Sequence, residues 1–271
     1  MRISWLCNAV CGTLLALTPA AHAAGAVRYV ALGDSFVAGP LIPDPQPGSP
    51  PGCLRSTHNY PSLVAAKLKI ADFADVSCSG AQTGDVTKKQ LGALTPKTTL
   101  VTLGIGGNDI GYGNIAVSCG ELGLFNPFGA PCAKKYGATV DRRISATAPK
   151  VGRILAAIHS RAPLAKVLVV GYLRLLPSGR GCWPRVPLGP ADTAYVDAEE
   201  RKLNRMLADQ ARAAKVTFID TYKGGDGHDV CAAEPQRWVE GVVPQSPAAP
   251  MHPNARGMRV VAARVLAALE S

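Results

Sequence analysis

The sequence predicts an α/β fold in which helices cover both faces of a mainly parallel sheet. Short apolar runs typical of buried strands recur along the chain, and stretches with helical periodicity lie between them. Strands that alternate with helices pair in parallel, because each crossover helix returns the chain to the same end of the sheet. The five strand-like runs are residues 27–32, 73–76, 99–103, 166–171 and 216–219.

Helices are predicted where apolar residues recur at every third or fourth position. The stretches with this spacing are residues 60–68, 141–160, 192–214 and 253–269. Between them, segments rich in proline and glycine predict irregular loops, because neither residue favours long regular elements. These segments are residues 40–53, 118–132 and 176–190, and a fourth irregular region spans residues 222–251.

The first 24 residues are typical of a secretory signal peptide. A positive start, Met1-Arg2, precedes an apolar run at residues 6–17, and the small residues around Ala23 and Ala24 predict cleavage there. The apolar run is too short to span a membrane comfortably. Residues 25–271 show no internal repeat or dividing linker, so we expect one secreted domain.

Six of the eight cysteines lie beyond the predicted signal peptide. An even number in an exported chain predicts three disulfides, and the absence of a CxxC pair argues against a zinc site. Pairing in sequence order is the preferred arrangement, because each bridge then closes a local loop. The preferred pairs are Cys53–Cys78, Cys119–Cys132 and Cys182–Cys231.

The formal net charge of the chain is +10, from 29 basic and 19 acidic residues. Such a surface fits a soluble protein, and it also allows a non-specific attraction to anionic lipid or cell-wall surfaces. The basic residues are scattered, with neither an arginine-rich run nor alternation with aromatic residues. Nucleic-acid binding is therefore not expected. Separately, we expect the protein to be a monomer.

Three motifs place polar groups or glycines directly after predicted strands. Ser35, in "GDS", follows the first strand, where it is either a helix N-cap or a group displayed at the ligand-binding edge of the sheet. Asn108, in "GGND", supplies an amide donor after the strand at 99–103, or forms an Asx-turn. Gly80, in "SCSG", either brings a backbone N–H towards a site or turns the chain.

A serine nucleophile needs a base, and four histidines lie beyond the predicted signal peptide. His252 stands immediately before a helix that Pro253 opens, which fixes its imidazole at a loop–helix junction. His58 is interpreted as a loop or capping residue, His159 as a helix-surface residue and His228 as a loop residue near a cysteine. We therefore expect His252 to be the base.

The order of these motifs resembles the SGNH, or GDSL-type, hydrolases, and the four blocks span nearly all of residues 25–271. The six cysteines and the tail "GHDVC…RWVEG…HPNARG" are particularly similar to secreted actinobacterial lipases and esterases of that family. The resemblance implies a three-layer α/β/α sandwich around a five-stranded, mainly parallel sheet. It also implies disulfides paired in sequence order, in agreement with the preferred arrangement.

By the same resemblance, Ser35 is a nucleophile that loses its proton to His252 and forms an acyl-enzyme. The oxyanion hole is assigned to the backbone N–H groups of Ser35 and Gly80 and to the Asn108 side chain. No metal or organic cofactor is expected, because this chemistry is complete with side chains. Asp34 and Asp109 are expected to anchor their turns.

One position departs from the family pattern. The aspartate usually found three residues before the histidine is Ala249 here. A histidine base still needs its other ring nitrogen fixed. We prefer a Ser–His dyad in which the main-chain carbonyl of Ala249 or Pro250 fills that role; the alternative is a carboxylate from Asp226, Asp229 or Glu240.

The expected activity is hydrolysis of fatty-acyl esters by a lipase or esterase, with phospholipase activity as an extension. The apolar segments 36–43 and 122–131 either line an acyl groove or pack as plain loops. A carbohydrate acetyl esterase is the nearest alternative, but it needs aromatic platforms and the aromatic content is only 6%. A catalytically silent binding protein is less favoured, because Ser35, Gly80, Asn108 and His252 are all retained.

Overall fold

A five-stranded parallel sheet, in the order β2-β1-β3-β4-β5, forms the centre of the molecule. The computed structural model describes Met1 and residues 27–270, so the rest of the predicted signal peptide and its cleavage site lie outside the described residues. Each predicted strand corresponds to an observed one. The strands are β1 (Arg28–Gly33), β2 (Asp72–Asp75), β3 (Leu100–Gly104), β4 (Lys166–Val170) and β5 (Thr217–Ile219).

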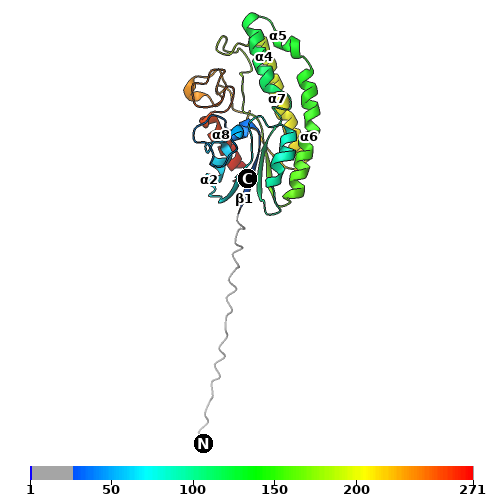
Figure 1. Ribbon diagram of the computed structural model, residues 1–271, viewed down its shortest axis with the longest axis vertical. Coiled ribbons are helices and arrows are strands. Elements are labelled where there is room, and N and C mark those ends of the chain that lie inside the picture. The colour runs from blue at the N-terminus through cyan, green and yellow to red at the C-terminus, as the bar shows by residue number, and fades with distance from the viewer. Residues whose placement is uncertain (2–26, 271) are drawn as a thin grey trace.

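Helices cover both faces of this sheet (Figure 1). On one face α6 (Thr139–Arg161) packs along α7 (Pro190–Ala213), and on the other α2 (Tyr60–Lys67) packs against α8 (Ala255–Glu270). The central strands β1 and β3 are rich in Val and Leu and buried almost throughout, as expected for strands covered on both sides. The predicted three-layer α/β/α sandwich is therefore confirmed.

The prediction of an irregular segment at residues 118–132 is wrong. Helix α4 (Tyr112–Phe125) continues through most of it, and α5 (Pro131–Tyr136) begins before it ends. In this segment glycine allows close packing rather than a turn. A Cβ on Gly123 would lie 1.9 Å from the carbonyl oxygen of Pro187, which leaves no room for a side chain. Glycine composition alone cannot distinguish a turn from such a close approach.

The remaining short elements lie in the segments that connect the strands and the longer helices. They are α1 (Ser35–Ala38), η1 (Pro51–Cys53), α3 (Thr83–Asp85), η2 (Val86–Gln90), η3 (Leu91–Ala93) and η4 (Glu234–Gln236). Within the described residues, no helix is both long and apolar enough to cross a membrane.

Three disulfides join the cysteines in sequence order, as Cys53–Cys78, Cys119–Cys132 and Cys182–Cys231. The second of them joins helix α4 to helix α5. The third closes the longest separation, 49 residues, and ties the segment after β4 to the irregular region that follows β5. This last bridge therefore restrains the part of the chain that leads to His252.

Candidate active site

Ser35 and His252, 217 positions apart in the sequence, meet at the carboxyl edge of the sheet. The Ser35 Oγ lies 2.8 Å from the His252 Nε2, and the His252 Nδ1 lies 2.7 Å from the carbonyl oxygen of Pro250. Because a carbonyl only accepts hydrogen bonds, this contact places the imidazole proton on Nδ1. The Nε2 lone pair is then free to accept the Ser35 hydroxyl proton.

The turn that carries Ser35 is held by backbone contacts on both sides. Gln90 brackets Gly33, accepting from its N–H at 2.8 Å and donating to its carbonyl at 2.9 Å. Gly33 itself passes so close to β3 that a Cβ would lie 2.4 Å from the Gly104 carbonyl oxygen. The Asp34 carboxylate then caps α1 by accepting from the Phe36 N–H at 2.9 Å. Ser35 thus follows β1 in a tightly determined position.

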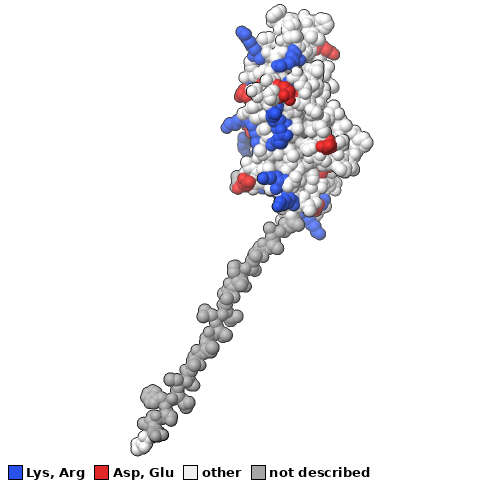
Figure 2. All heavy atoms as spheres, turned by 90° about the vertical axis from the view of Figure 1, so that its left-hand side faces the viewer, with Lys and Arg blue, Asp and Glu red and all other residues white. Residues whose placement is uncertain are grey.

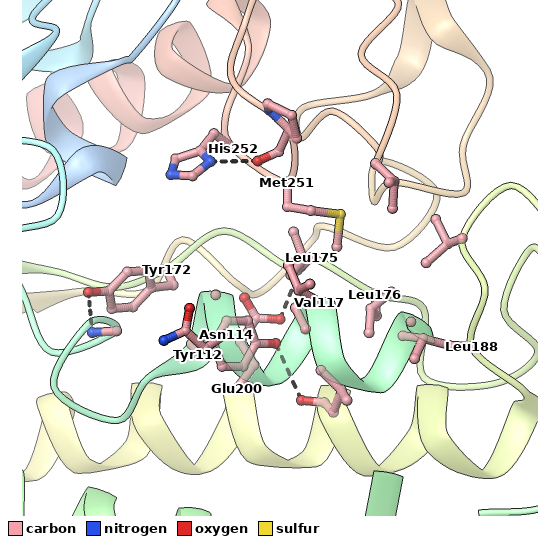
Figure 3. Close-up of a pocket in the computed structure, with 18 of the residues that line it drawn as sticks. Tyr112, Asn114, Val117, Tyr172, Leu175, Leu176, Leu188, Glu200, Met251 and His252 are labelled. Atoms are coloured by element: carbon pink, nitrogen blue, oxygen red, sulfur yellow. Dashed lines mark hydrogen bonds between the residues drawn. The ribbon is translucent and has the colours of Figure 1, made fainter. Parts of the chain in front are cut away.

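Tyr172 links this turn to the loop that carries Asn108. Its hydroxyl donates to the Asp34 carboxylate at 2.5 Å. The same hydroxyl accepts from the Gly107 N–H at 2.7 Å (Figure 3). Burial raises the pKa of Asp34 to about 7, against the opposing hydrogen bond from Tyr172. Asp34 therefore anchors the turn, and one phenol fixes the spacing between two segments of the site.

Asn108 and Gly80 are connected to the same framework. The Asn108 side-chain amide donates to the Ala81 carbonyl at 2.9 Å, and an amide has a second N–H for another acceptor. Cys78 donates to the Gly33 carbonyl at 3.0 Å, which places the turn containing Gly80 beside the nucleophile turn. At Gly80 φ is +79°, and an added Cβ would meet open space, so backbone conformation is what calls for glycine here.

Asp109 has a positioning role like that of Asp34. Its carboxylate accepts from the Thr83 N–H at 2.9 Å and from the Thr83 hydroxyl. These bonds join the loop after β3 to α3, which follows the turn containing Gly80. The two aspartates thus anchor turns, as the sequence predicts.

The two main-chain carbonyls considered for His252 differ in what they contact. The Ala249 carbonyl accepts from the His252 backbone N–H at 3.2 Å, whereas the Pro250 carbonyl contacts the ring. Met251, between Pro250 and His252, adopts a φ of +59°, which is unusual for a residue with a side chain. The backbone curls at Met251, so that the Pro250 carbonyl, two residues before His252, reaches the imidazole ring of His252.

The three carboxylates considered as alternatives have other partners. Asp226 pairs with Arg174, and Asp229 accepts from the Cys231 N–H at 2.8 Å. Glu240 is fully buried and accepts from the Asn254 amide at 2.8 Å.

Glu240 and Asn254 position the histidine loop, a role that the quoted stretches containing them do not signal. Asn254 accepts from the N–H groups of Arg256 and Gly257 at the start of α8, while its amide also donates to the Arg237 carbonyl at 3.0 Å. The Glu240 N–H donates to the His252 carbonyl at 2.9 Å. A cluster of buried polar side chains therefore holds the loop that carries His252 in place.

The surroundings of His252 favour its neutral form. Burial lowers the pKa of His252 below its usual range, against the opposing hydrogen bond with the Pro250 carbonyl. The Phe36 ring lies 5.2 Å from the imidazole between centroids and supplies part of this apolar contact. A neutral imidazole at neutral pH is the form that accepts a proton.

Ser35 and His252 border a cavity of about 480 Å³ with mainly apolar walls (Figure 3). This volume falls within the range of roughly 300–1,000 Å³ typical of small-molecule sites. Of the two segments considered for an acyl groove, residues 36–43 contribute Phe36 and residues 122–131 contribute Leu124. Further apolar lining comes from Val117, Leu175, Val186, Leu188 and Val242.

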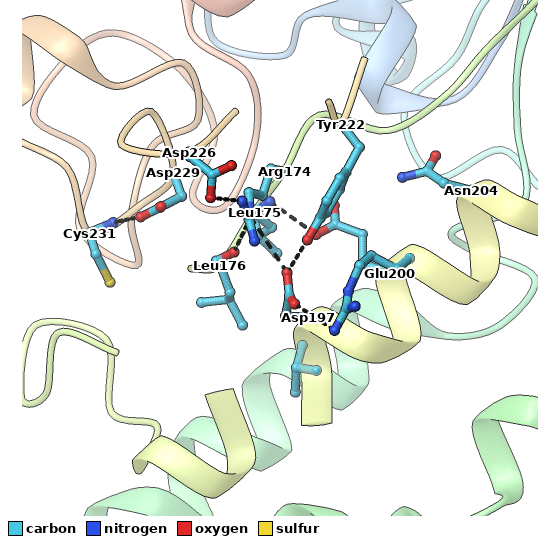
Figure 4. A network of polar contacts seen from close by, with 12 residues as sticks. Arg174, Leu175, Leu176, Asp197, Glu200, Asn204, Tyr222, Asp226, Asp229 and Cys231 are labelled. Carbon is cyan, nitrogen blue, oxygen red and sulfur yellow. Dashed lines mark hydrogen bonds and ion pairs between the residues drawn. The ribbon is translucent and has the colours of Figure 1, made fainter. Parts of the chain in front are cut away.

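A network of charged groups built on the buried side chains of Arg174 and Asp197 supports one wall of the cavity (Figure 4). Arg174, which is 6% exposed, donates to the Leu176 carbonyl at 3.1 Å, lies 3.6 Å from the Asp197 carboxylate and pairs with Asp226. Tyr222 donates to Asp197. These contacts fix the segment after β4 against α7 and thereby position the cavity-lining residues Leu175 and Leu176.

The other candidate histidines lie away from the cavity. His58 contacts Asp44 at 2.9 Å, and the His159 ring lies 3.2 Å from the Ala214 carbonyl oxygen. His228 stacks on Trp238 with ring centroids 4.0 Å apart. Among the described residues, no group of three or more His, Cys, Asp or Glu side chains is arranged to hold a metal ion.

Comparisons with known proteins agree with this geometry. The profile of the GDSL-like lipase/acylhydrolase family matches residues 31–260. The chain is 37% identical to Lipase 2 of Streptomyces coelicolor over 280 residues, covering 96% of this chain and 94% of the relative.

Two solved structures are also similar. The extracellular lipase of Streptomyces rimosus has 31% identity and a TM-score of 0.79, covering 90% of this chain and 100% of that one. Phospholipase A1 of Streptomyces albidoflavus has 27% identity and a TM-score of 0.79, covering 89% and 99%. The family resemblance is thereby confirmed: the chain belongs to the GDSL-like lipase/acylhydrolase family of ester hydrolases.

Proposed function

We propose that this ester hydrolase is an exported lipase or esterase that cleaves fatty-acyl esters through a dyad of Ser35 and His252. The observation that carries the proposal is the 2.8 Å contact between Ser35 Oγ and His252 Nε2 at the border of a mainly apolar cavity. A nucleophile and its base within hydrogen-bond reach are the signature of covalent ester hydrolysis.

Acylation begins when Ser35 Oγ attacks the ester carbonyl carbon and its proton passes to His252 Nε2. The carbonyl oxygen becomes an oxyanion that the N–H groups of Ser35 and Gly80 and the Asn108 amide stabilise, each donor contributing roughly 3–4 kcal/mol. The C–O bond to the alcohol then breaks, and the imidazolium returns its proton to the leaving oxygen. Water hydrolyses the acyl-enzyme by the same steps, which regenerates Ser35.

The Pro250 carbonyl takes the place that a carboxylate has in a triad. At 2.7 Å it fixes the proton on Nδ1 and keeps Nε2 directed at Ser35. A carbonyl carries only a partial charge, so it stabilises the imidazolium less than a carboxylate does. The lowered pKa of His252 fits this arrangement, because the base remains neutral until it receives the serine proton.

The cavity favours an acyl chain over an acetyl group. Its apolar walls gain from burying methylene groups, each contributing about 0.8 kcal/mol, whereas an acetyl group leaves most of the 480 Å³ to water. A carbohydrate acetyl esterase is the alternative enzyme, and a catalytically silent binding protein is the alternative outside enzymes. The similar proteins named as lipases and as phospholipase A1 support the fatty-acyl assignment.

We further propose that the protein is exported, that it is a monomer, and that it contacts anionic lipid surfaces peripherally. Export is supported by the leader-like sequence of residues 1–24 and by three disulfides, which persist in oxidising compartments. The net charge of +10 supports attraction to anionic lipid.

The test is hydrolysis of p-nitrophenyl esters from acetyl to palmitoyl by the oxidised, exported protein. We expect the highest kcat/KM with a medium or long chain, and loss of activity in Ser35→Ala and in His252→Ala. Ser145→Ala and His159→Ala, which change residues away from the cavity, are the matched controls. Activity confined to the acetyl ester would indicate a carbohydrate esterase, and a folded wild type inactive on every ester would contradict the proposal.

A further inference from the structure

We propose that the outer end of α4 and the segment after it seat the protein on an anionic phospholipid bilayer. Phe125 and Phe128 insert among the acyl chains, and Lys134 and Lys135 face the headgroup phosphates. The proposal rests on the proposed function, because it places the mouth of the acyl cavity against the aggregate that holds the substrate.

Large apolar side chains are unusually exposed at this end of the molecule. Phe125, at the end of α4, is 90% exposed, and Phe128, in the segment after it, is 97% exposed. Val117 and Leu124, also on α4, are 64% and 55% exposed. Single exposed apolar residues are ordinary, but a group of this kind marks a surface that contacts something apolar. Two fully exposed phenylalanines three residues apart have no partner among the described residues that would account for them.

This apolar surface is continuous with the cavity. Val117 and Leu124 both line the cavity and reach solvent, so α4 forms a wall inside and a rim outside. The opposite rim is also apolar, since Val242 lines the cavity while 45% exposed and Val243 is 77% exposed. An acyl chain that leaves a bilayer at this rim would stay in contact with apolar groups until it reaches the cavity.

Cations outnumber anions at the apolar rim, where Glu121 on α4 is exposed and lines the cavity and two lysines lie on the adjoining α5. Lys134 and Lys135 are exposed on α5, which the Cys119–Cys132 disulfide joins to α4. The Lys135 ammonium donates to the Ser118 hydroxyl at 2.8 Å, so it lies next to Val117 on the rim. On the face shown in Figure 2, the tip of the molecule is free of charged side chains, and both basic and acidic side chains begin just below it.

A bilayer fits this surface better than a second copy of the chain. Two copies, each with a net charge of +10, would repel one another, and a protein partner seated on the rim would cover the cavity mouth. A bilayer instead supplies apolar chains to Phe125 and Phe128 and negative charge to the lysines. The surface thus matches an anionic phospholipid in both its apolar and its charged parts.

The experiment measures binding to vesicles of phosphatidylglycerol and phosphatidylcholine in equal parts by co-sedimentation. All proteins carry Ser35→Ala so that the vesicles stay intact. We expect Phe125→Ser with Phe128→Ser to weaken binding roughly a hundredfold, and Lys134→Glu with Lys135→Glu to weaken it roughly tenfold or more. Leu164→Ser, which removes a 73% exposed leucine just before β4 at the opposite edge of the sheet, is the matched control and should bind unchanged.

Hydrolysis of a soluble butyryl ester by the same variants with Ser35 restored separates this proposal from the proposed function. Phe125 and Phe128 do not line the cavity, so we expect the butyryl activity of their variant to match the wild type. Equal vesicle binding by the phenylalanine variant and the Leu164 control would overturn the docking surface. So would a dimer that dissociates when the phenylalanines are replaced. If the wild type does not hydrolyse the butyryl ester, the esterase dyad is contradicted. The vesicle experiment then still decides whether the phenylalanines dock on the bilayer.

Discussion

The two walls that meet at the candidate active site are built differently. The serine wall consists of the carboxyl ends of β1 and β3, where Gly33 and Gly104 approach closely and the backbone itself fixes Ser35. The histidine wall is the end of an irregular segment, residues 222–251, held by the buried side chains of Glu240 and Asn254 and by the Cys182–Cys231 disulfide. Regular sheet backbone positions Ser35, whereas individual side chains and a disulfide position His252.

Because the two walls are held in different ways, substitutions in them should have different effects. Changes on the serine wall act on the chemistry, because the sheet stays folded while a donor or nucleophile is lost. Changes on the histidine wall act first on the stability of the loop and through it on the fraction of molecules with His252 in place. The variants described below each remove a part of one wall, and their stability, their reaction rate or both are measured.

Loss of the Cys182–Cys231 disulfide should have the largest effect on stability. The paired change Cys182→Ser with Cys231→Ser releases a loop of 49 residues, and chain entropy predicts a loss of about 4 kcal/mol. Chemical denaturation measures this free energy of unfolding. The control, Cys119→Ser with Cys132→Ser, releases 13 residues and should cost about 3 kcal/mol with a smaller loss of activity. Equal losses of activity in the two pairs would show that this bridge does not support the histidine wall.

On the serine wall, Asn108→Ala should lower kcat by about 10²–10³-fold, because it removes one oxyanion donor. Stability should change little, since Asn108 makes one hydrogen bond through its side chain, to the Ala81 carbonyl. Steady-state kinetics with a soluble ester and thermal unfolding give the two readouts. Asn126→Ala, an exposed change at the end of α4, is the control and should retain full activity on the soluble ester. A similar kcat in both variants would remove Asn108 from the oxyanion hole.

Tyr172→Phe should lower kcat by about tenfold with KM nearly unchanged, because the hydroxyl spaces the Asp34 and Gly107 segments without contacting the ester. Tyr195→Phe is the control, since that hydroxyl bonds the Gly137 carbonyl on the surface. A change in KM alone would mean that Tyr172 serves the cavity wall rather than the spacing of the catalytic groups.

The smallest effect should be a pH dependence of stability from Asp34. Its folded pKa is raised to about 7, so the folded state binds one more proton than the unfolded state between pH 4 and 7, and stability falls as pH rises through that window. Asp34→Asn removes this proton uptake. We expect the wild type to lose on the order of 1 kcal/mol relative to the variant between pH 6 and 7.5. Parallel stability curves for the two proteins would contradict an Asp34 that is neutral at acidic pH.

The sheet and most helices could be predicted because their signals are local. The five apolar runs and the spacing of apolar residues in α6, α7 and α8 need only neighbouring positions to be read. Helix α4 could not be predicted this way, since its Gly120 and Gly123 are explained only by Pro187 packing against them. Composition reports which residue is present but not what lies opposite it.

The same distinction applies to the site. Ser35, Gly80, Asn108 and His252 stand in short motifs, and their order along the chain identified them. Gln90 and Tyr172 stand in no motif, and their roles depend on partners 57 and 138 positions away. Glu240 stands in the quoted stretch RWVEG, but its role depends on Asn254, 14 positions away. The choice of Pro250 over Ala249 likewise depends on the left-handed backbone at Met251, which a sequence without glycine there does not signal.

The most direct measurement of the central claim is covalent labelling of Ser35 by a fluorophosphonate. Attack by Ser35 Oγ forms a serine–phosphorus bond and releases fluoride, with the hydroxyl proton passing to His252. We predict a single adduct, located by mass spectrometry on the peptide that contains Ser35, whose formation is slowed by His252→Ala but not by His159→Ala. In the wild type the labelling rate should decline only as pH falls through a pKa below that of an ordinary histidine, because burial lowers the pKa of His252. Labelling of a different residue, or equal rates with and without His252, would contradict the Ser35–His252 dyad.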